Sequence, residues 1–185
     1  MSSETVICPA RPSDLDAIAD IYAHYVTGTV ATFDEVPPSL AEWRRRLDDL
    51  TERGLPFLVA KIGDVVVGYA YAGPWRPKPA YRHTLEDSVY LAPGWTGRGV
   101  GRALLEALLR GCEEAGARQV VAVIADTGSD ASAALHSSLG FVHVGRLSGV
   151  GHKHGRWVDT VLMQRALVDP QLVDPASLIK EVSTS

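Results

Sequence analysis

The chain has 185 residues, of which 46% are hydrophobic, and it carries a formal net charge of −4. This composition fits one domain with a sizeable core and excludes a disordered chain. It offers no basic excess for nucleic acid or an anionic membrane, so we expect neither as a partner. Cys8 and Cys112 are too few for a disulfide framework or a cysteine metal cluster, and we expect no metal site. No signal peptide and no apolar run of about 20 residues is visible, so we expect a cytoplasmic protein.

The first half of the chain predicts a strand, two helices and a hairpin. Residues 5–10 form the strand, and Pro12-Ser13-Asp14 starts a helix in which Ser13 or Asp14 caps free N–H groups. A loop then covers residues 28–38. Ser39 starts a second helix, which Gly54 ends. Strands over residues 56–62 and 65–71 flank a tight turn at Gly63-Asp64.

The second half predicts further strands that alternate with two helices. The expected strands cover residues 83–91, 120–125, 141–146 and 158–163. A strongly amphipathic helix contains Leu104, Leu105, Leu108 and Leu109, and a short helix covers residues 131–139. We expect an α/β (α+β) domain over residues 1–167, with a mixed, mostly antiparallel sheet flanked by helices. Residues 168–185 are expected to form a C-terminal tail.

A glycine-rich segment lies between the strand at 83–91 and the amphipathic helix. It reads Gly97-Arg98-Gly99-Val100-Gly101-Arg102. Glycine lets the backbone approach a ligand closely, and a helix N-terminus offers unpaired N–H groups, so the segment can bind a diphosphate. A plain turn is the alternative. A Rossmann loop fits less well because the spacing is Gly-x-Gly-x-Gly, and a Walker loop lacks its Gly-Lys-Ser/Thr.

The glycine segment, with Thr96 before it, resembles the acyl-CoA signature of the GNAT N-acetyltransferase superfamily, although Thr96 and Gly97 stand where a Gln/Arg start is usual. Within the superfamily, the chain resembles the phosphinothricin/methionine sulfone N-acetyltransferases. Four blocks in the same order carry this likeness: residues 70–76 (AYAGPWR), 86–90 (EDSVY), 135–141 (LHSSLGF) and 153–159 (KHGRWVD).

The resemblance implies a GNAT fold whose twisted sheet splays centrally to hold acetyl-CoA as co-substrate. Glu86 matches the carboxylate that takes the proton of the amine, and His136 stands where many GNAT enzymes have a tyrosine near the CoA sulfur. Alternatively, Glu86 pairs with Arg82 and His136 only caps or packs. The residues expected to bind acetyl-CoA are Val89, Tyr90, Leu91, Gly97, Arg98, Gly99, Val100, Gly101, Arg102 and Ser129. Ser129 stands where members of this branch usually have Asn. Asp130 or Ser132 is the expected cap of the helix that follows.

The expected substrate is a small amino-acid analogue of the phosphinothricin, methionine sulfone or methionine sulfoximine type. An arginine fork suits its anionic oxygens. The residues expected to bind it are Phe33, Arg76, Pro77, Lys78, Tyr81, Glu86, Asp87 and Ser88. The alternative for the Arg76–Lys78 segment is a solvated basic loop. His152-Lys153-His154 makes a poor zinc site and is expected to be a turn that shapes the active site, within one subunit or across a subunit interface.

We also expect a homodimer. Three other functions remain open: a GNAT enzyme acting on another amine such as a protein N-terminus, a CoA-binding sensor without turnover, and, more distantly, a Rossmann-type oxidoreductase.

Overall fold

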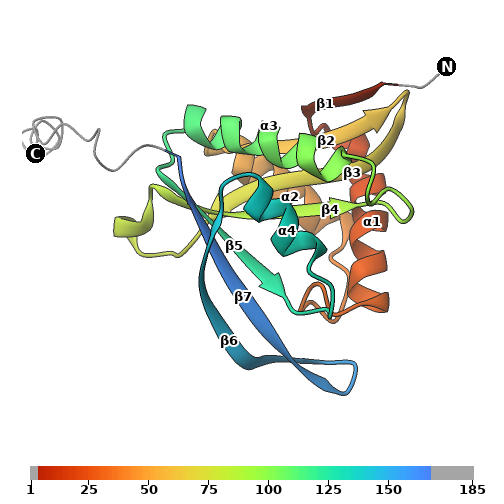
Figure 1. Ribbon diagram of the computed structural model, residues 1–185. Coiled ribbons are helices and arrows are strands. Elements are labelled where there is room, and N and C mark those ends of the chain that lie inside the picture. Colours follow the sequence, from red (N-terminus) through yellow and green to blue (C-terminus); the bar gives the residue numbers. More distant parts are fainter. Residues whose placement is uncertain (1–3, 168–185) are drawn as a thin grey trace, which may run out of the picture.

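The computed structural model describes residues 4–167, which form a seven-stranded sheet with helices on both faces (Figure 1). The expected tail, residues 168–185, lies outside the described residues. The elements in chain order are β1 (Thr5–Pro9), a 3-10 turn (Pro12–Asp14), α1 (Leu15–Gly28), α2 (Leu40–Glu52), β2 (Phe57–Ile62), β3 (Val65–Pro74), a 3-10 turn (Pro79–Tyr81), β4 (Thr84–Leu91), α3 (Val100–Glu114), β5 (Gln119–Ala125), α4 (Ala131–Ser138), β6 (Val142–Lys153) and β7 (Arg156–Ala166).

Several local signals act as the sequence predicts. Ser39 and Glu42 form a capping box, in which Ser39 Oγ accepts from Glu42 N–H and Glu42 Oε2 accepts from Ser39 N–H at 2.7 Å. Gly63, at φ +58°, turns the chain between β2 and β3. Asp14 differs from its prediction, because its carboxylate does not cap α1. It accepts from Arg11 N–H at 2.9 Å and pairs with Lys61 at 2.6 Å.

The last two strands are longer than predicted and form one extended hairpin. The sequence predicted strands over 141–146 and 158–163, whereas β6 and β7 reach the turn at His154-Gly155. Two register shifts, between His143 and Gly145 and between Leu147 and Gly151, interrupt the alternation of apolar and polar residues in β6. Because the alternation is the signal that predicts a strand, these irregularities hid the continuation of β6.

The sheet has the order β1-β2-β3-β4-β5-β7-β6, and all neighbouring strands are antiparallel except β4 and β5. That parallel pairing extends over only three residue pairs, the last of which joins Glu86 to Val121. Beyond it the two strands diverge, and Figure 1 shows β5 and the β6–β7 hairpin leaving the plane of β1–β4. The splayed mixed sheet is therefore confirmed.

Two apolar clusters stabilise the sheet from its two faces. One packs α3 residues such as Leu104 and Leu108 against Ala70, Leu85 and Val120. The other, on the opposite face, packs α1 and α2 against β2 and β3, and it is rich in aromatic rings. Within residues 4–167 no helix combines the length and apolar character needed to cross a membrane.

Candidate active site

A cavity of about 520 Å³ opens where β4 and β5 separate. Its walls come from the free ends of β4 and β5, from α1 and the loop after it, and from the start of α4. The lining residues are Tyr22, Tyr25, Ala31, Thr32, Phe33, Tyr71, Glu86, Asp87, Ser88, Val89, Tyr90, Leu91, Thr96, Ala122, Val123, Ile124, Ala125, Thr127, Ser129, Ala131, Ser132, Leu135, His136 and Thr160. Six predicted site residues on β4 thus reach the same cavity as Phe33, Ser129 and His136.

Glu86 lies at the vertex of the split, because it is the last β4 residue that pairs with β5. Burial raises the pKa of its carboxyl group, and the neighbouring Asp87 charge raises it further, while the charge of Arg76 opposes both effects. A carboxylate with a raised pKa is a better proton acceptor near neutral pH. Glu86 makes no ion pair with Arg82 among the described residues, so the salt-bridge alternative is not observed.

Asp87 and His136 form a buried pair on the neighbouring wall. His136 Nε2 lies 2.9 Å from Asp87 Oδ2, and His136 Nδ1 lies 2.7 Å from the carbonyl oxygen of Ser132. A carbonyl and a carboxylate both accept, so both ring nitrogens are placed to donate, as an imidazolium does. Burial alone would lower the pKa of His136, but the hydrogen bond and charge of Asp87, with the Ser132 carbonyl, raise it.

Two polar oxygens of the cavity lining lack a hydrogen-bond partner within residues 4–167. They are Asp87 Oδ1 and Thr160 Oγ1, and both are buried. A buried polar atom without a partner costs free energy unless a ligand or water satisfies it. The cavity therefore suits a ligand that carries hydrogen-bonding groups.

Tyrosine rings form the wall that faces α1. Tyr90 packs edge to face against both Tyr22 and Tyr25, with ring centroids 5.1 Å apart in each pair. Tyr25 also donates from its hydroxyl group to the Leu91 carbonyl oxygen at 2.7 Å. These contacts fix the end of β4, where its edge toward β5 has no strand partner.

The glycine-rich segment has the backbone that a close approach of ligand requires. Gly97 and Gly99 have φ values of +74° and +80°, and Gly99 is the residue before the first turn of α3. A Cβ atom at either position would meet no atom of the chain within 4 Å, so the space outside both is open. Thr96, just upstream, lines the cavity, whereas residues 97–102 lie beyond its lining.

The two arginines of this segment are already engaged. Arg98 lies over the Trp95 ring at 4.8 Å, and Arg102 pairs with Glu106 at 2.9 Å. Arg102 also donates to Ser138 Oγ, which joins α3 to α4. Their contact with a diphosphate stays a prediction.

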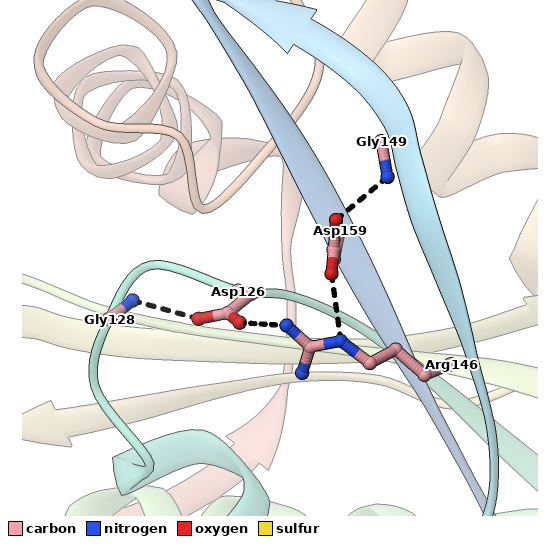
Figure 2. A network of polar contacts seen from close by, with 5 residues as sticks. All are labelled: Asp126, Gly128, Arg146, Gly149 and Asp159. Carbon is pink, nitrogen blue, oxygen red and sulfur yellow. Dashed lines mark hydrogen bonds and ion pairs between the residues drawn. The ribbon is translucent and has the colours of Figure 1, made fainter.

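A polar network holds the loop between β5 and α4 against the β6–β7 hairpin (Figure 2). Arg146 donates to Asp126 and, at 2.8 Å, to Asp159, and Asp159 also accepts from Gly149 N–H at 2.7 Å. Asp126 in turn accepts from Gly128 N–H at 3.0 Å. The network thereby fixes the loop that carries Thr127 and Ser129 to the cavity.

Ser129 caps the start of α4, a role that the sequence assigned to Asp130 or Ser132. Its hydroxyl oxygen accepts from Ala131 N–H at 3.3 Å, while Asp130 makes no side-chain capping bond. Ser129 lines the cavity at the expected position.

Four of the residues expected to bind substrate lie outside this cavity. Arg76, Pro77, Lys78 and Tyr81 are all exposed on the segment between β3 and β4, and Arg76 lies over the Trp75 ring at 5.0 Å. Arg76 nevertheless acts on Glu86 through its charge. Their contact with substrate therefore remains a prediction.

Several lining residues were missed by sequence reasoning. Tyr90 was among the residues expected to bind acetyl-CoA, whereas Tyr22, Tyr25 and Tyr71 were not predicted, because apolar spacing along a helix or strand cannot distinguish a core wall from a cavity wall. Thr160 carried no signal, because its contribution depends on the β5–β7 pairing that places it opposite Ala125.

The comparisons with known proteins agree with this geometry. Residues 7–162 match the acetyltransferase (GNAT) domain family. The chain is 52% identical to a phosphinothricin N-acetyltransferase of Alcaligenes faecalis, covering 85% of this chain and 80% of the relative. It is 40% identical to an L-methionine sulfoximine/L-methionine sulfone acetyltransferase of Pseudomonas aeruginosa, covering 87% and 93%.

Among solved structures, a phosphinothricin acetyltransferase of Sinorhizobium meliloti in complex with acetyl-CoA is similar at a TM-score of 0.87 and 42% identity, covering 95% of this chain and 94% of that one. The split sheet and these matches agree, and the chain belongs to the GNAT acetyltransferase family.

Proposed function

We propose that the protein transfers an acetyl group from acetyl-CoA to the α-amino group of a small amino-acid analogue of the phosphinothricin, methionine sulfone or methionine sulfoximine type. The observation that carries this proposal is the half-buried Glu86 at the vertex of the split sheet, facing a cavity that also contains unsatisfied polar atoms. The names of the similar enzymes support the class of substrate.

In this proposal acetyl-CoA lies along the free edge of β4, with Val89 to Leu91 beside the pantetheine arm and the start of α3 beside the diphosphate. Backbone N–H groups at that edge have no strand partner and can donate to the thioester oxygen. The open space at Gly97 and Gly99 supports the fit. The α-amino group is largely protonated near neutral pH, so a base is needed before it can attack.

Glu86 supplies that base. It takes a proton from the amine, directly or through water, as the amine nitrogen forms its bond to the acetyl carbonyl carbon. The carbon–sulfur bond then breaks, and the CoA thiolate leaves and takes up the second proton that the amine nitrogen loses on becoming an amide, directly or through water. His136 could supply this proton only by giving up one of its two hydrogen bonds, because both nitrogens are engaged. The geometry therefore favours His136 first as the group that orients Asp87.

The size of the cavity supports a small acceptor. The cavity has about 520 Å³, and Val89 to Leu91, beside which the pantetheine arm is proposed to lie, line the same space, so the acceptor occupies only part of it. A protein N-terminus would need a groove for several residues of its chain.

We also propose that the protein forms a homodimer through the β6–β7 hairpin. Five large apolar side chains are exposed there, namely Val142, Val144, Leu147, Val150 and Trp157, the last at 72%. Large apolar side chains exposed along an edge hairpin are typical of a protein–protein interface. Sedimentation of the full chain should give a dimer and Trp157→Glu should shift it toward monomer; a monomeric parent at micromolar concentration contradicts this proposal.

A cytoplasmic location is proposed as well. Both cysteines, Cys8 and Cys112, are free thiols in the structure. Free thiols are the usual state in a reducing compartment.

Substrate choice can be read from CoA release over a panel of amines. We expect turnover with methionine sulfone, methionine sulfoximine and phosphinothricin, and much slower release with a peptide that begins with alanine. Faster release with the peptide would favour the protein N-terminus as acceptor. Binding of acetyl-CoA without release for any amine would favour the sensor.

Glu86→Gln should lower kcat/KM by about 100-fold at neutral pH, the usual scale for a positioned base. The amide keeps the size of the side chain but cannot accept the proton. In the parent, kcat/KM should fall as the pH drops through the raised pKa of Glu86, because the protonated form is inactive. The variant should lack this fall in kcat/KM. High pH should partly restore the activity of the variant, because more of the substrate amine is then already deprotonated.

Single-turnover kinetics separate this chemistry from binding. Glu52→Gln, an exposed change at the end of α2, is the matched control and should behave as the parent. A Glu86→Gln variant with the parental rate and pH profile would rule out Glu86 as the base.

Gly99→Val should weaken acetyl-CoA binding by about tenfold or more, equivalent to about 1.4 kcal/mol. A branched side chain disfavours φ +80° and fills the open space beside α3. Gly63→Val is the control, because it places the same strain at φ +58° in the β2–β3 turn, away from the cavity. Calorimetric titration of both variants measures the effect, and equal affinities for acetyl-CoA would remove the glycine segment from the binding site.

A further inference from the structure

Gly151 of β6 lies against the ring of Phe33, a residue of the cavity wall. A Cβ atom at position 151 would lie within 2.7 Å of three ring atoms of Phe33, Cε1, Cζ and Cε2, a separation at which something must move. Gly151 is buried and pairs with Val158 in the hairpin. Its φ is not positive, so the backbone does not require glycine there. The missing side chain makes room for the ring.

The backbone on both sides of Phe33 is held in place. Lys153, two residues after Gly151 and only 4% exposed, donates from Nζ to the Thr32 carbonyl oxygen at 2.8 Å. Tyr22 holds the loop from the other side, because its hydroxyl group lies 2.7 Å from Thr32 Oγ1 and donates to Asp34 Oδ2 at 2.6 Å. The loop cannot shift without breaking these contacts, so a clash at position 151 must be relieved by the ring of Phe33.

The Phe33 side chain has open space on the side away from Gly151. Phe33 lines the cavity whereas Gly151 does not, so the ring lies between β6 and the open space. At 38% exposure the ring is not packed on all sides. A ring displaced from Gly151 toward the cavity would take up part of the space that Glu86 and Ser88 also line.

We propose that Gly151 is a specificity-determining residue: glycine at this position, with Lys153 holding the loop, sets how far the Phe33 ring extends into the acceptor end of the cavity. The space left by the ring admits an amino acid whose side chain ends in a bulky tetrahedral sulfur or phosphorus group. This inference rests on the proposed function for the identity of the acceptor, and on the contact itself for the role of Gly151. In this proposal Lys153, the first residue of the 153–159 block, acts by holding the loop that carries Phe33.

The test is a double-mutant cycle on positions 151 and 33. Gly151→Ala should raise KM for methionine sulfone about tenfold, the scale expected when about one methylene of space is lost from a pocket. KM for acetyl-CoA should change less than about twofold, because the ring lies at the acceptor end. Phe33→Leu lacks the three clashing ring atoms, so Gly151→Ala in that background should change KM for methionine sulfone little.

Gly145→Ala is the matched control on the same strand. A Cβ atom there would meet its nearest neighbour, Leu162 Cδ1, at 3.9 Å, an ordinary contact, and KM should not change. If Gly151→Ala raises KM equally in the parent and in the Phe33→Leu background, the effect does not pass through Phe33 and the inference is wrong.

Thermal unfolding of the same four proteins separates this inference from the proposed function. The clash should lower Tm in Gly151→Ala, and the loss should be smaller in the Phe33→Leu background, whatever the substrate is. Should the parent acetylate none of the amino-acid analogues while this coupling in Tm is present, the proposed acceptor fails and the contact stands. Additive changes in Tm overturn the contact itself.

Discussion

The short parallel pairing between β4 and β5 is the constraint on which the rest of the structure depends. Three residue pairs join the strands, and past Glu86 and Val121 the backbone of each strand faces open space. Backbone groups that lose their partners must bond to something else, which is water or a ligand. The same divergence that removes these partners also creates the cavity, so one feature of the sheet provides both the space and the donors.

The position of each residue along β4 determines which side of the strand its side chain faces. Because side chains alternate along a strand, Glu86, Ser88 and Tyr90 face the tyrosine wall, while Asp87 faces His136 on α4. Two adjacent carboxylates thereby enter different surroundings. Asp87 is bound to an imidazole, whereas Glu86 is half buried beside a carboxylate and has a raised pKa. This difference suits Asp87 to holding His136 in place and Glu86 to proton transfer.

Local patterns in the sequence predicted those parts of the fold that local physics determines. Ser39 and Glu42 meet within one helical turn, and Gly63 needs only its own φ, so both could be identified from neighbours in the chain. The site residues on β4 were predicted from the resemblance to the acetyltransferase family, and the structure places them along one cavity. The length of the β6–β7 hairpin was missed because its bulges break the alternation on which strand prediction depends. Contacts such as Lys153 with Thr32, 121 residues apart, depend on the finished fold and leave no local pattern.

The apolar cluster beneath α3 continues across the split, since it includes Leu85 and Ala70 from one side and Val120, Phe141 and Met163 from the other. In mechanical terms, the two parts of the sheet are joined by a few directional backbone bonds and by packing that has no preferred direction. Hydrogen bonds resist a change of register, whereas apolar contacts tolerate small rotations of one surface on the other. The junction should therefore be stiff along the strands and compliant across them, which lets the width of the opening adapt while the vertex stays fixed.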